Sequence, residues 1–490
     1  MLVLKELFDL TDLQALEELE FNLLWHHALR LTPEEAHLCQ KTLHNFRVRL
    51  LEHDGGRLAF GEVTGRILEA FGIHVVRQRL DSTHIVSNIA TLTRLGLFCE
   101  TIRVFLRALR AHHPRLYKRV PEGLRSRYVK DDRPTRYEDA RSSESRRRLS
   151  VCARDVFRLL DRFRGTTGSK RDEYALLERL FDDQCEFTAS KAKPDEDDDD
   201  VNDEAVPVTL KKPKKVASDS LQTPHDPDVT YSGHKGKGYE VQVSETTDER
   251  NAVEIITHVD VTPSSGSDAS QTIPVLEVLA EREIQPEELI ADTTYGSVEN
   301  ALEAERMGTD LVAPVSGKAA AEAPDGELLG AADFAVHAGY ATPTTCPAGR
   351  ESIQEFVIDD NPNRVEVHFA KDVCESCPLY NRCPARFYQA MNTYVLAVDL
   401  VKSTLTKRRR AEATSTFRAR YAPRAGIEAT NSELKRSHGL GRPRVRGHLR
   451  VRLAVFLKAT ACNVKRMIGA VLRALPTDAT RRDAVAVAGS

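Results

Sequence analysis

The sequence predicts an α/β protein in which a mixed β-sheet is flanked by helices. Short apolar stretches with strand-like alternation, such as Tyr239–Val243 and Val253–Val261, are followed by a stretch with apolar residues at helical spacing, Asp268–Glu281. A succession of strands and helices of this kind is expected of a sheet with helices packed on it. A single hydrophobic core stops growing at about 250–300 residues, so we expect this chain of 490 residues to contain further domains.

The first part of the chain predicts a helical module and then one strand of the sheet. Residues 1–72 repeat apolar residues at three- and four-residue spacing, and Thr32-Pro33 is typical of a helix start. His74–Leu80 is short, contains two adjacent valines and follows a glycine, which favours a strand. We therefore expect a helical module over 1–72 and a first strand within 73–88 that ends at Asp81.

Two segments should then interrupt the sheet. Residues 89–187 carry an apolar stripe at helical spacing with arginines between its members, which predicts a helical insertion. Residues 188–222 contain a run of acidic residues and then four lysines. Because like charges in such blocks repel each other and stay solvated, we expect a charged, flexible linker there.

The rest of the sheet is expected over residues 223–316. Glu288–Ala291 is a short apolar strand that leads into Asp292, so acidic residues stand at two strand ends. Residues 317–400 break the alternation with small, polar and cysteine-bearing sequence, which we interpret as an insertion. Helical periodicity returns in the basic region 401–472, and residues 473–490 form a tail that we expect to fray.

The charge distribution predicts a polyanion-binding element near the C-terminus. The formal net charge is only −3, yet Lys402–Arg466 holds 18 Lys and Arg against three Glu. No run of eighteen apolar residues occurs, and charges within the first ten residues do not fit a signal peptide. Nine cysteines in such a chain imply reduced thiols. We therefore expect a cytoplasmic protein that does not cross a membrane.

The most specific motif consists of Tyr421, Arg424, Glu428 and Lys435. On a helix with 3.6 residues per turn these positions fall within an arc of roughly 60°, so all four could line one stripe. A carboxylate among cations suits a site for metal and phosphate. Pro423 fits the first turn of such a helix, which would leave Tyr421 just outside it.

This full spacing resembles the Tyr-Arg-Glu-Lys signature of a large group of bacterial insertion-sequence DDE transposases, and the segment 438–447, which begins His-Gly-Leu-Gly-Arg, resembles the same group. Asp81 with the Ser-Thr that follows it resembles the first catalytic aspartate of that family, and Asp292 within Ala-Asp-Thr-Thr-Tyr-Gly resembles the second. The resemblance covers roughly residues 12–470. It implies an RNase H-like domain, of the retroviral integrase-like superfamily, in which Asp81, Asp292 and Glu428 hold two Mg²⁺ or Mn²⁺ ions.

The resemblance also implies an activity and partners. Two ions roughly 3.5–4 Å apart stabilise the attacking and leaving oxygens of an in-line displacement at phosphorus, first with water and then with a 3′-hydroxyl as the nucleophile. Arg424 and Lys435 would contact phosphates, and Tyr421 would contact the backbone or a flanking base of a transposon end. The expected partners are double-stranded terminal repeats and target DNA in the bacterial nucleoid, bound by a homodimer, with residues 1–72 serving end binding or assembly.

Two points stay open. Asp292 follows Asp81 by 211 residues, a long gap for the first two acidic strands of such a core, and Asp226 and Asp228 compete for the first position. We favour Asp81 because it ends a predicted strand, whereas Asp-Pro at 226–227 favours a turn. The alternative functions are an inactive, domesticated transposase that only binds DNA and a metal nuclease without strand transfer. An intact acidic triad argues against the inactive form.

The cysteines divide into two groups. Cys346, Cys374, Cys377 and Cys383 offer four thiolates, three of them followed by proline, which suits a structural zinc knuckle or a small subdomain with free thiols. The remaining cysteines lack partners at ligand spacing, and we expect them to be core residues. They are Cys39, Cys99, Cys152, Cys185 and Cys462.

Overall fold

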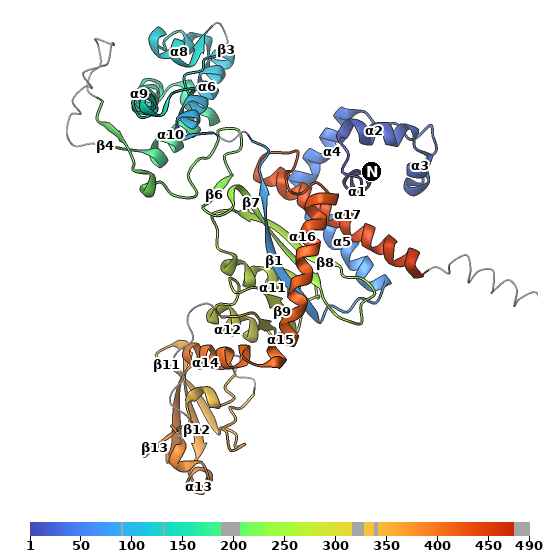
Figure 1. Ribbon diagram of the computed structural model, residues 1–490, viewed down its shortest axis with the longest axis vertical. Coiled ribbons are helices and arrows are strands. Elements are labelled where there is room, and N and C mark those ends of the chain that lie inside the picture. Colours follow the sequence, from blue (N-terminus) through green and yellow to red (C-terminus); the bar gives the residue numbers. More distant parts are fainter. Residues whose placement is uncertain (90–91, 131–132, 188–205, 316–327, 338–341, 475–490) are drawn as a thin grey trace, which may run out of the picture.

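A mixed α/β architecture is present in the computed structural model, which describes residues 1–89, 92–130, 133–187, 206–315, 328–337 and 342–474 (Figure 1). A central sheet carries three attachments that lie at different corners of the molecule: the N-terminal helices, a helical insertion and a small second sheet (Figure 1). This confirms an α/β fold with a mixed sheet and many helices. Within the described ranges, no helix is both long and apolar enough to cross a membrane.

The central sheet has six strands in the order β10-β9-β1-β7-β6, with β8 also paired to β7. Strand β1 lies in the middle, parallel to β9 on one side and antiparallel to β7 on the other. The strands are β1 (Arg77–Val86), β6 (Thr230–Ser232), β7 (Gly236–Thr246), β8 (Ile256–Pro263), β9 (Glu288–Ala291) and β10 (Asp310–Val312).

Helices cover both faces of this sheet because its strands are apolar on both sides. Alternate residues of a strand point to opposite faces. Leu80 accordingly packs with α11 (Thr272–Glu281) and α12 (Val298–Arg306), whereas Val243 lies in the core that includes residues of α5, α16 and α17. The three helices that contribute to this second core are α5 (Gly55–Ala70), α16 (Ile427–Ser437) and α17 (His448–Ala474). A short 3₁₀ turn, Asp268–Gln271, precedes α11.

The N-terminal residues form helices, as the sequence predicts. They are α1 (Leu2–Leu7), α2 (Asp12–Phe21), α3 (Leu23–Leu29) and α4 (Gln40–Glu52), followed by α5. Helix α1 packs on α17 through a buried lysine: Lys458 Nζ donates to Glu6 Oε2 at 2.6 Å and also to the His438 carbonyl oxygen. The helical module is therefore attached directly to the helices of the core.

The helical insertion has a hydrophobic core of its own. Its helices are α6 (Arg94–His112), α7 (Pro114–Tyr117), α8 (Glu122–Tyr128), α9 (Ser142–Phe163) and α10 (Asp172–Gln184), with short strands β2 (Val129–Lys130), β3 (Arg133–Pro134), β4 (Cys185–Phe187) and β5 (Val208–Leu210) and 3₁₀ turns Thr167–Lys170 and Pro213–Lys215. The expectation of a flexible linker over 188–222 fails for 206–222, because β5 pairs with β4 and Leu221 is fully buried. The acidic run 195–200 lies outside the described residues.

A second sheet fills much of the region that we expected to be an irregular insertion. Its strands β11 (Gln354–Ile358), β12 (Asn361–Ala370), β14 (Thr393–Asp399) and β13 (Arg386–Tyr388) form an antiparallel sheet in the order β11-β12-β14-β13. The short helix α13 (Lys371–Glu375) and 3₁₀ turns Ala331–Asp333 and Tyr380–Arg382 accompany it. The chain then returns to the central sheet through α14 (Leu400–Glu412) and α15 (Ser415–Tyr421).

Candidate active site

Asp81 and Asp292 are neighbours because two parallel strands place them in register. Leu80 of β1 pairs with Ala291 of β9. Asp81 directly follows Leu80 in the sequence, and Asp292 directly follows Ala291. Strand β1 does not end at Asp81, as the apolar pattern predicted, but continues to Val86, since β7 keeps pairing with it beyond Asp81. Asp81 lies opposite Val243 in that ladder. Its side chain therefore faces the side of the sheet that α16 covers.

The Tyr-Arg-Glu-Lys motif follows a helical path made of three segments. Tyr421 is the last residue of α15, Arg424 lies in the 3₁₀ turn Ala422–Gly426, and Glu428 occupies the first turn of α16. Lys435 lies in the last turn of α16. A single helix starting near Pro423 was expected, and the observed 3₁₀ turn is consistent with a proline that cannot donate a backbone hydrogen bond.

The Arg424 guanidinium contacts all three carboxylates. Its Nη2 lies 3.3 Å from Asp81 Oδ1 and 3.8 Å from Asp292 Oδ2, and its Nη1 donates to Glu428 Oε1 at 2.9 Å. Burial opposes the charge of Arg424, but the surrounding carboxylates raise its pKa. One cation thus gathers acids from two strands and a helix.

Asp81 is the most deeply placed of the three acids. Its side chain is 12% exposed, compared with 32% for Asp292 and 68% for Glu428. Burial raises the pKa of Asp81 to about 6; Arg424 opposes the shift, whereas Asp292 and Asp268 add to it. A carboxyl that is desolvated and repelled by other acids becomes easier to ionise when a cation binds beside it.

Hydrogen bonds fix the orientation of the two aspartates. Asn431, one turn after Glu428 on α16, donates from Nδ2 to Asp81 Oδ2 at 3.2 Å. Asp292 Oδ1 accepts from the backbone N–H of Thr294 at 2.8 Å, which holds the carboxylate at the end of β9. Asn431 was not among the predicted site residues, although its three-residue distance from Glu428 places both on one side of the helix.

The other two members of the motif surround this centre. The Tyr421 ring stacks on Phe417, with ring centroids 5.8 Å apart. Burial raises the pKa of Tyr421; Arg424 opposes this shift, whereas Asp292 and Asp81 add to it. Burial lowers the pKa of the half-buried Lys435, while Glu240 and Asp81 act in the opposite direction.

A buried ion pair holds the start of α16 against the sheet. Arg79 lies two residues before Asp81 on the same strand, and its Nη2 is 2.7 Å from Glu245 Oε1. Its Nη1 donates a hydrogen bond to the Pro423 carbonyl oxygen at 2.7 Å. Glu245 is fully buried and also accepts from Thr430 of α16 at 2.6 Å. These contacts connect β1 to the turn that carries Arg424, and sequence spacing gave no indication of them.

The competing aspartates hold the loops around the start of α17 and lie in a different place. Asp226 is fully buried and accepts from Ser87 at 2.5 Å, Tyr239 at 2.7 Å and the Gly447 backbone at 3.1 Å. Asp228 accepts from the backbone N–H of His448, the first residue of α17. Both side chains thus have structural partners, as expected of turn and cap residues.

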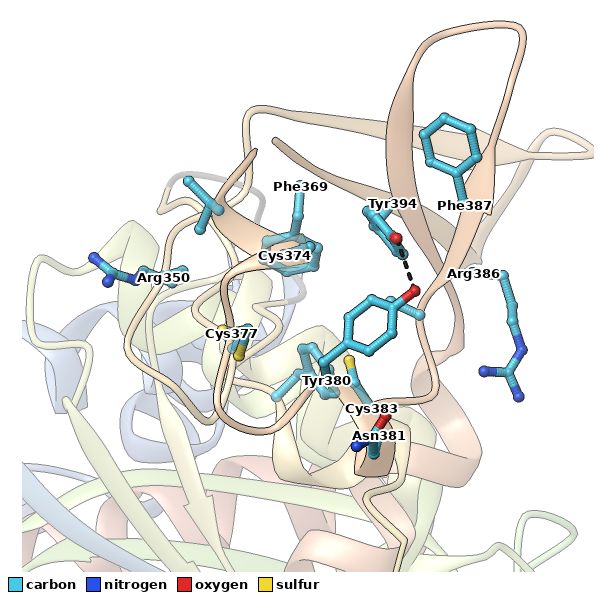
Figure 2. Close-up of a pocket in the computed structure, with 14 residues that line it drawn as sticks. Arg350, Phe369, Cys374, Cys377, Tyr380, Asn381, Cys383, Arg386, Phe387 and Tyr394 are labelled. Atoms are coloured by element: carbon cyan, nitrogen blue, oxygen red, sulfur yellow. Dashed lines mark hydrogen bonds between the residues drawn. The ribbon is translucent and has the colours of Figure 1, made fainter. Parts of the chain in front are cut away.

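The four cysteines of the predicted zinc knuckle line one cavity of about 310 Å³ in the second-sheet domain. Figure 2 shows Cys374, Cys377 and Cys383 together with Tyr380 in the lining of this cavity, and the Tyr380 hydroxyl contacts that of Tyr394 at 2.9 Å. Burial raises the pKa of Cys374 to about 11, and the three other thiols add to this shift. The backbone N–H of Leu379 donates to Cys377 Sγ at 3.4 Å. The cluster is a second candidate metal centre.

Metal-binding donors converge most closely at a third place. Among the residues that the structure describes, Glu433, His438 and Cys462 form the set whose ligand atoms all lie within 4.8 Å of one another. Neither the catalytic candidates nor the four cysteines form such a set within the described ranges. At the acidic centre, the Arg424 guanidinium lies among the carboxylates of Asp81, Asp292 and Glu428.

Comparison with known proteins links part of the chain to a family. A family model described as a transposase DDE domain matches residues 345–468. The match includes the cysteine cluster and the Tyr421–Lys435 motif but neither Asp81 nor Asp292. No curated protein and no solved structure matched the chain. The match supports a DDE transposase, a class of enzyme that acts on DNA and generally uses divalent metal ions.

Proposed function

We propose that the chain is a transposase that cleaves DNA at insertion-sequence ends and joins the released 3′-ends to target DNA. Asp81, Asp292 and Glu428 are the proposed metal-binding triad of an RNase H-like catalytic domain. The match of a transposase DDE domain supports the general function. The mixed sheet, with its central strand parallel to β9 and antiparallel to β7, is compatible with the proposed fold class.

The observation that carries the proposal is the contact of one guanidinium with three carboxylates. Asp81, Asp292 and Glu428 come from positions far apart in the sequence, yet Arg424 touches each of them within 3.8 Å. Three carboxylates around one guanidinium leave negative charge uncompensated, which is costly at the buried Asp81. A cluster with this excess of negative charge, next to the paired strands β1 and β9, is suited to bind further cations.

The residues fit hard divalent ions such as Mg²⁺ or Mn²⁺. All three side chains offer oxygen ligands, which these ions prefer. Burial raises the pKa of Asp81, so a cation bound beside it would stabilise its ionised form. When bound, two such ions would activate the attacking oxygen and stabilise the leaving oxygen of a phosphodiester. Asn431 and the Thr294 backbone would keep the Asp81 and Asp292 carboxylates oriented toward this position.

In this proposal, Arg424 interacts first with the acids and then with DNA. In the protein alone it neutralises the acids, and with DNA present its forked guanidinium is able to turn to a phosphate oxygen. Lys435 would contact a phosphate as a point charge, and Tyr421 would contact the backbone or a base at the transposon end. We further propose that the N-terminal helices serve end binding or assembly and that a homodimer acts on paired ends.

The test uses purified full-length protein and linear DNA that carries the ends of the mobile element next to its gene. With Mg²⁺ we expect nicks at the element ends and, on addition of a supercoiled target, joined products; without Mg²⁺ we expect binding only. Nicks without joined products would favour a metal nuclease of the same fold. Specific binding without any cleavage in Mg²⁺ or Mn²⁺ would favour an inactive, domesticated DNA-binding protein.

A further inference from the structure

We infer that Glu433, His438 and Cys462 form a buried zinc site that is separate from the catalytic carboxylates and from the four-cysteine cluster. Glu433 lies in α16, His438 follows its last residue, and Cys462 lies in the middle of α17. One ligand atom from each residue lies within 4.8 Å of the other two. His438 and Cys462 have no solvent-exposed surface. The site lies at the junction of the two helices.

His438 is prepared as a ligand by its hydrogen bonding. Its Nδ1 lies 3.0 Å from the backbone carbonyl oxygen of Glu6, an acceptor, so Nδ1 carries the proton and donates it. The other ring nitrogen, Nε2, is buried and has no hydrogen-bond partner. Burial also lowers the pKa of this imidazole, which favours the neutral form. Histidines that bind metals commonly donate their second ring N–H to a backbone carbonyl or carboxylate in this way.

An unpartnered buried nitrogen otherwise has a cost. Leaving a buried polar atom without a partner costs about 1–3 kcal/mol, and native proteins keep few such atoms. A metal ion removes this cost by accepting the Nε2 lone pair. Cys462 supplies the second donor: burial raises the pKa of its thiol to about 12, partly opposed by Arg466, so without metal it is protonated. Binding of one Zn²⁺ would therefore release one proton from the Cys462 thiol to solvent as the zinc–sulfur bond forms.

Glu433 is the third donor and is already oriented by two cations. Its Oε1 accepts from Lys465 Nζ at 3.0 Å and its Oε2 from Arg466 Nε at 3.1 Å. A carboxylate has about four lone-pair sites, so these bonds leave room for a metal–oxygen bond. Arg466 is also neutralised by the fully buried Glu245 at 2.9 Å. The surroundings of the site therefore include both signs of charge.

The donor set identifies the class of metal. One thiolate, one imidazole nitrogen and one carboxylate oxygen suit Zn²⁺, whose tetrahedral coordination a water molecule would complete. Mg²⁺ and Ca²⁺, which need oxygen ligands, do not fit this set. Because His438 is bonded to Glu6 of α1, the ion would join α16 and α17 and, through His438, hold the N-terminal helices to the core. We assign it a structural role.

The experiment titrates Co²⁺ into the full-length protein with Cys374→Ser and Cys377→Ser, which removes ligands of the four-cysteine cluster. We expect a thiolate-to-cobalt charge-transfer band and tetrahedral d–d bands that saturate at one equivalent. Cobalt bound to carboxylates alone gives no such thiolate band, so the catalytic site does not interfere. Since one proton is released, the apparent affinity should rise about tenfold per pH unit below the thiol pKa.

Two further substitutions identify the ligands. Cys462→Ser should abolish the charge-transfer band, and His438→Asn, whose amide still reaches the Glu6 carbonyl while Nε2 is lost, should weaken binding at least about tenfold. Cys152→Ser, at another buried cysteine, should leave the band unchanged. An absent band, or an unchanged band in Cys462→Ser, would overturn the proposal.

A measurement on the unmodified protein covers the case in which these variants fail to fold. Crystals grown with Zn²⁺ should show an anomalous-scattering peak at the zinc edge between Cys462 Sγ and the His438 ring. If zinc peaks appear elsewhere in the molecule but this position has none, the inference is wrong.

Discussion

Replacing Gly426 by alanine should both destabilise the protein and slow DNA cleavage. Gly426 has φ −64° and ψ −23°, a conformation open to any residue, so the effect would come from contacts alone. An added Cβ would lie 2.1 Å from Arg79 Nη1 and 2.6 Å from Arg79 Cζ, far inside a normal contact. Either Arg79 or the start of α16 must move.

The relative costs decide which of them moves. Separating Arg79 from the buried Glu245 would break an ion pair, at about 3–5 kcal/mol, and would also free the Pro423 carbonyl. Shifting α16 is an overpacking strain of about 1–3 kcal/mol, so the helix start should yield. A displacement of about 1 Å at catalytic groups is able to lower a rate about 100-fold. We therefore expect Gly426→Ala to lower both the free energy of unfolding and the rate of cleavage, because Glu428 follows Gly426 by two residues.

The assay compares urea unfolding and Mg²⁺-dependent nicking of end DNA between Gly426→Ala and a matched control. As the control, Gly123→Ala lies on an exposed position of α8 in the helical insertion, where an added Cβ meets nothing within 4 Å. It should increase the free energy of unfolding by up to about 1 kcal/mol and leave nicking unchanged. If the two variants behave alike, Arg79 does not position α16 and the reasoning fails.

Three further predictions concern the metals and the DNA. Because burial raises the pKa of Asp81 to about 6, protons compete with Mg²⁺ for this carboxylate below that pH. Calorimetric titration should show the Mg²⁺ affinity falling about tenfold per pH unit below about 6 and levelling off above about 7. A constant Mg²⁺ affinity from pH 5 to 8 would contradict this prediction. Arg424→Ala and Lys435→Ala should each reduce the slope of log affinity against log salt by about 0.9, as seen in binding isotherms at several salt concentrations; unchanged slopes would show that these residues do not contact DNA phosphates. Cys374→Ser with Cys377→Ser should lower the zinc content in elemental analysis, and a zinc-free unmodified protein would favour free thiols.

Much of the acidic centre could be predicted from local sequence. Asp292 follows an apolar strand, and the spacing from Tyr421 to Lys435 indicates one helical face. The extent of β1 could not be predicted in the same way, because the residues after Asp81 are polar and the apolar pattern stops at Leu80. Pairing with β7, which lies more than 150 residues later, decides where that strand ends.

The contacts of Arg424 were also beyond sequence reasoning. We predicted a phosphate contact, whereas in the protein alone Arg424 pairs with three carboxylates. Helical spacing tells which residues share a face but not which partners the fold brings to that face. The same limit applies to Arg79 and Glu245, a buried pair whose members look like ordinary polar strand residues until β1 and β7 are paired.

Two stretches were interpreted as irregular because their composition obscured a strand pattern. In β12, the buried Val365, Val367 and Phe369 alternate with more polar residues, which is a strand signal. Cysteines, prolines and glycines around it favoured an insertion without regular structure. Residues 206–222 looked solvated from their lysines, but Leu221 packs into the core of the helical insertion.

The central claim is that Asp81, Asp292 and Glu428 act together in metal-dependent cleavage of DNA. The most direct test measures nicking and DNA binding side by side for Asp292→Asn, Glu428→Gln and Asp81→Asn, with Asp228→Asn as the comparison. We predict that the first three variants bind end DNA like the unmodified protein but do not cleave it with Mg²⁺, because they lose metal ligands rather than phosphate contacts. Cleavage at near-normal rates by any of the three, or an inactive Asp228→Asn beside an active Asp81→Asn, would contradict the assignment.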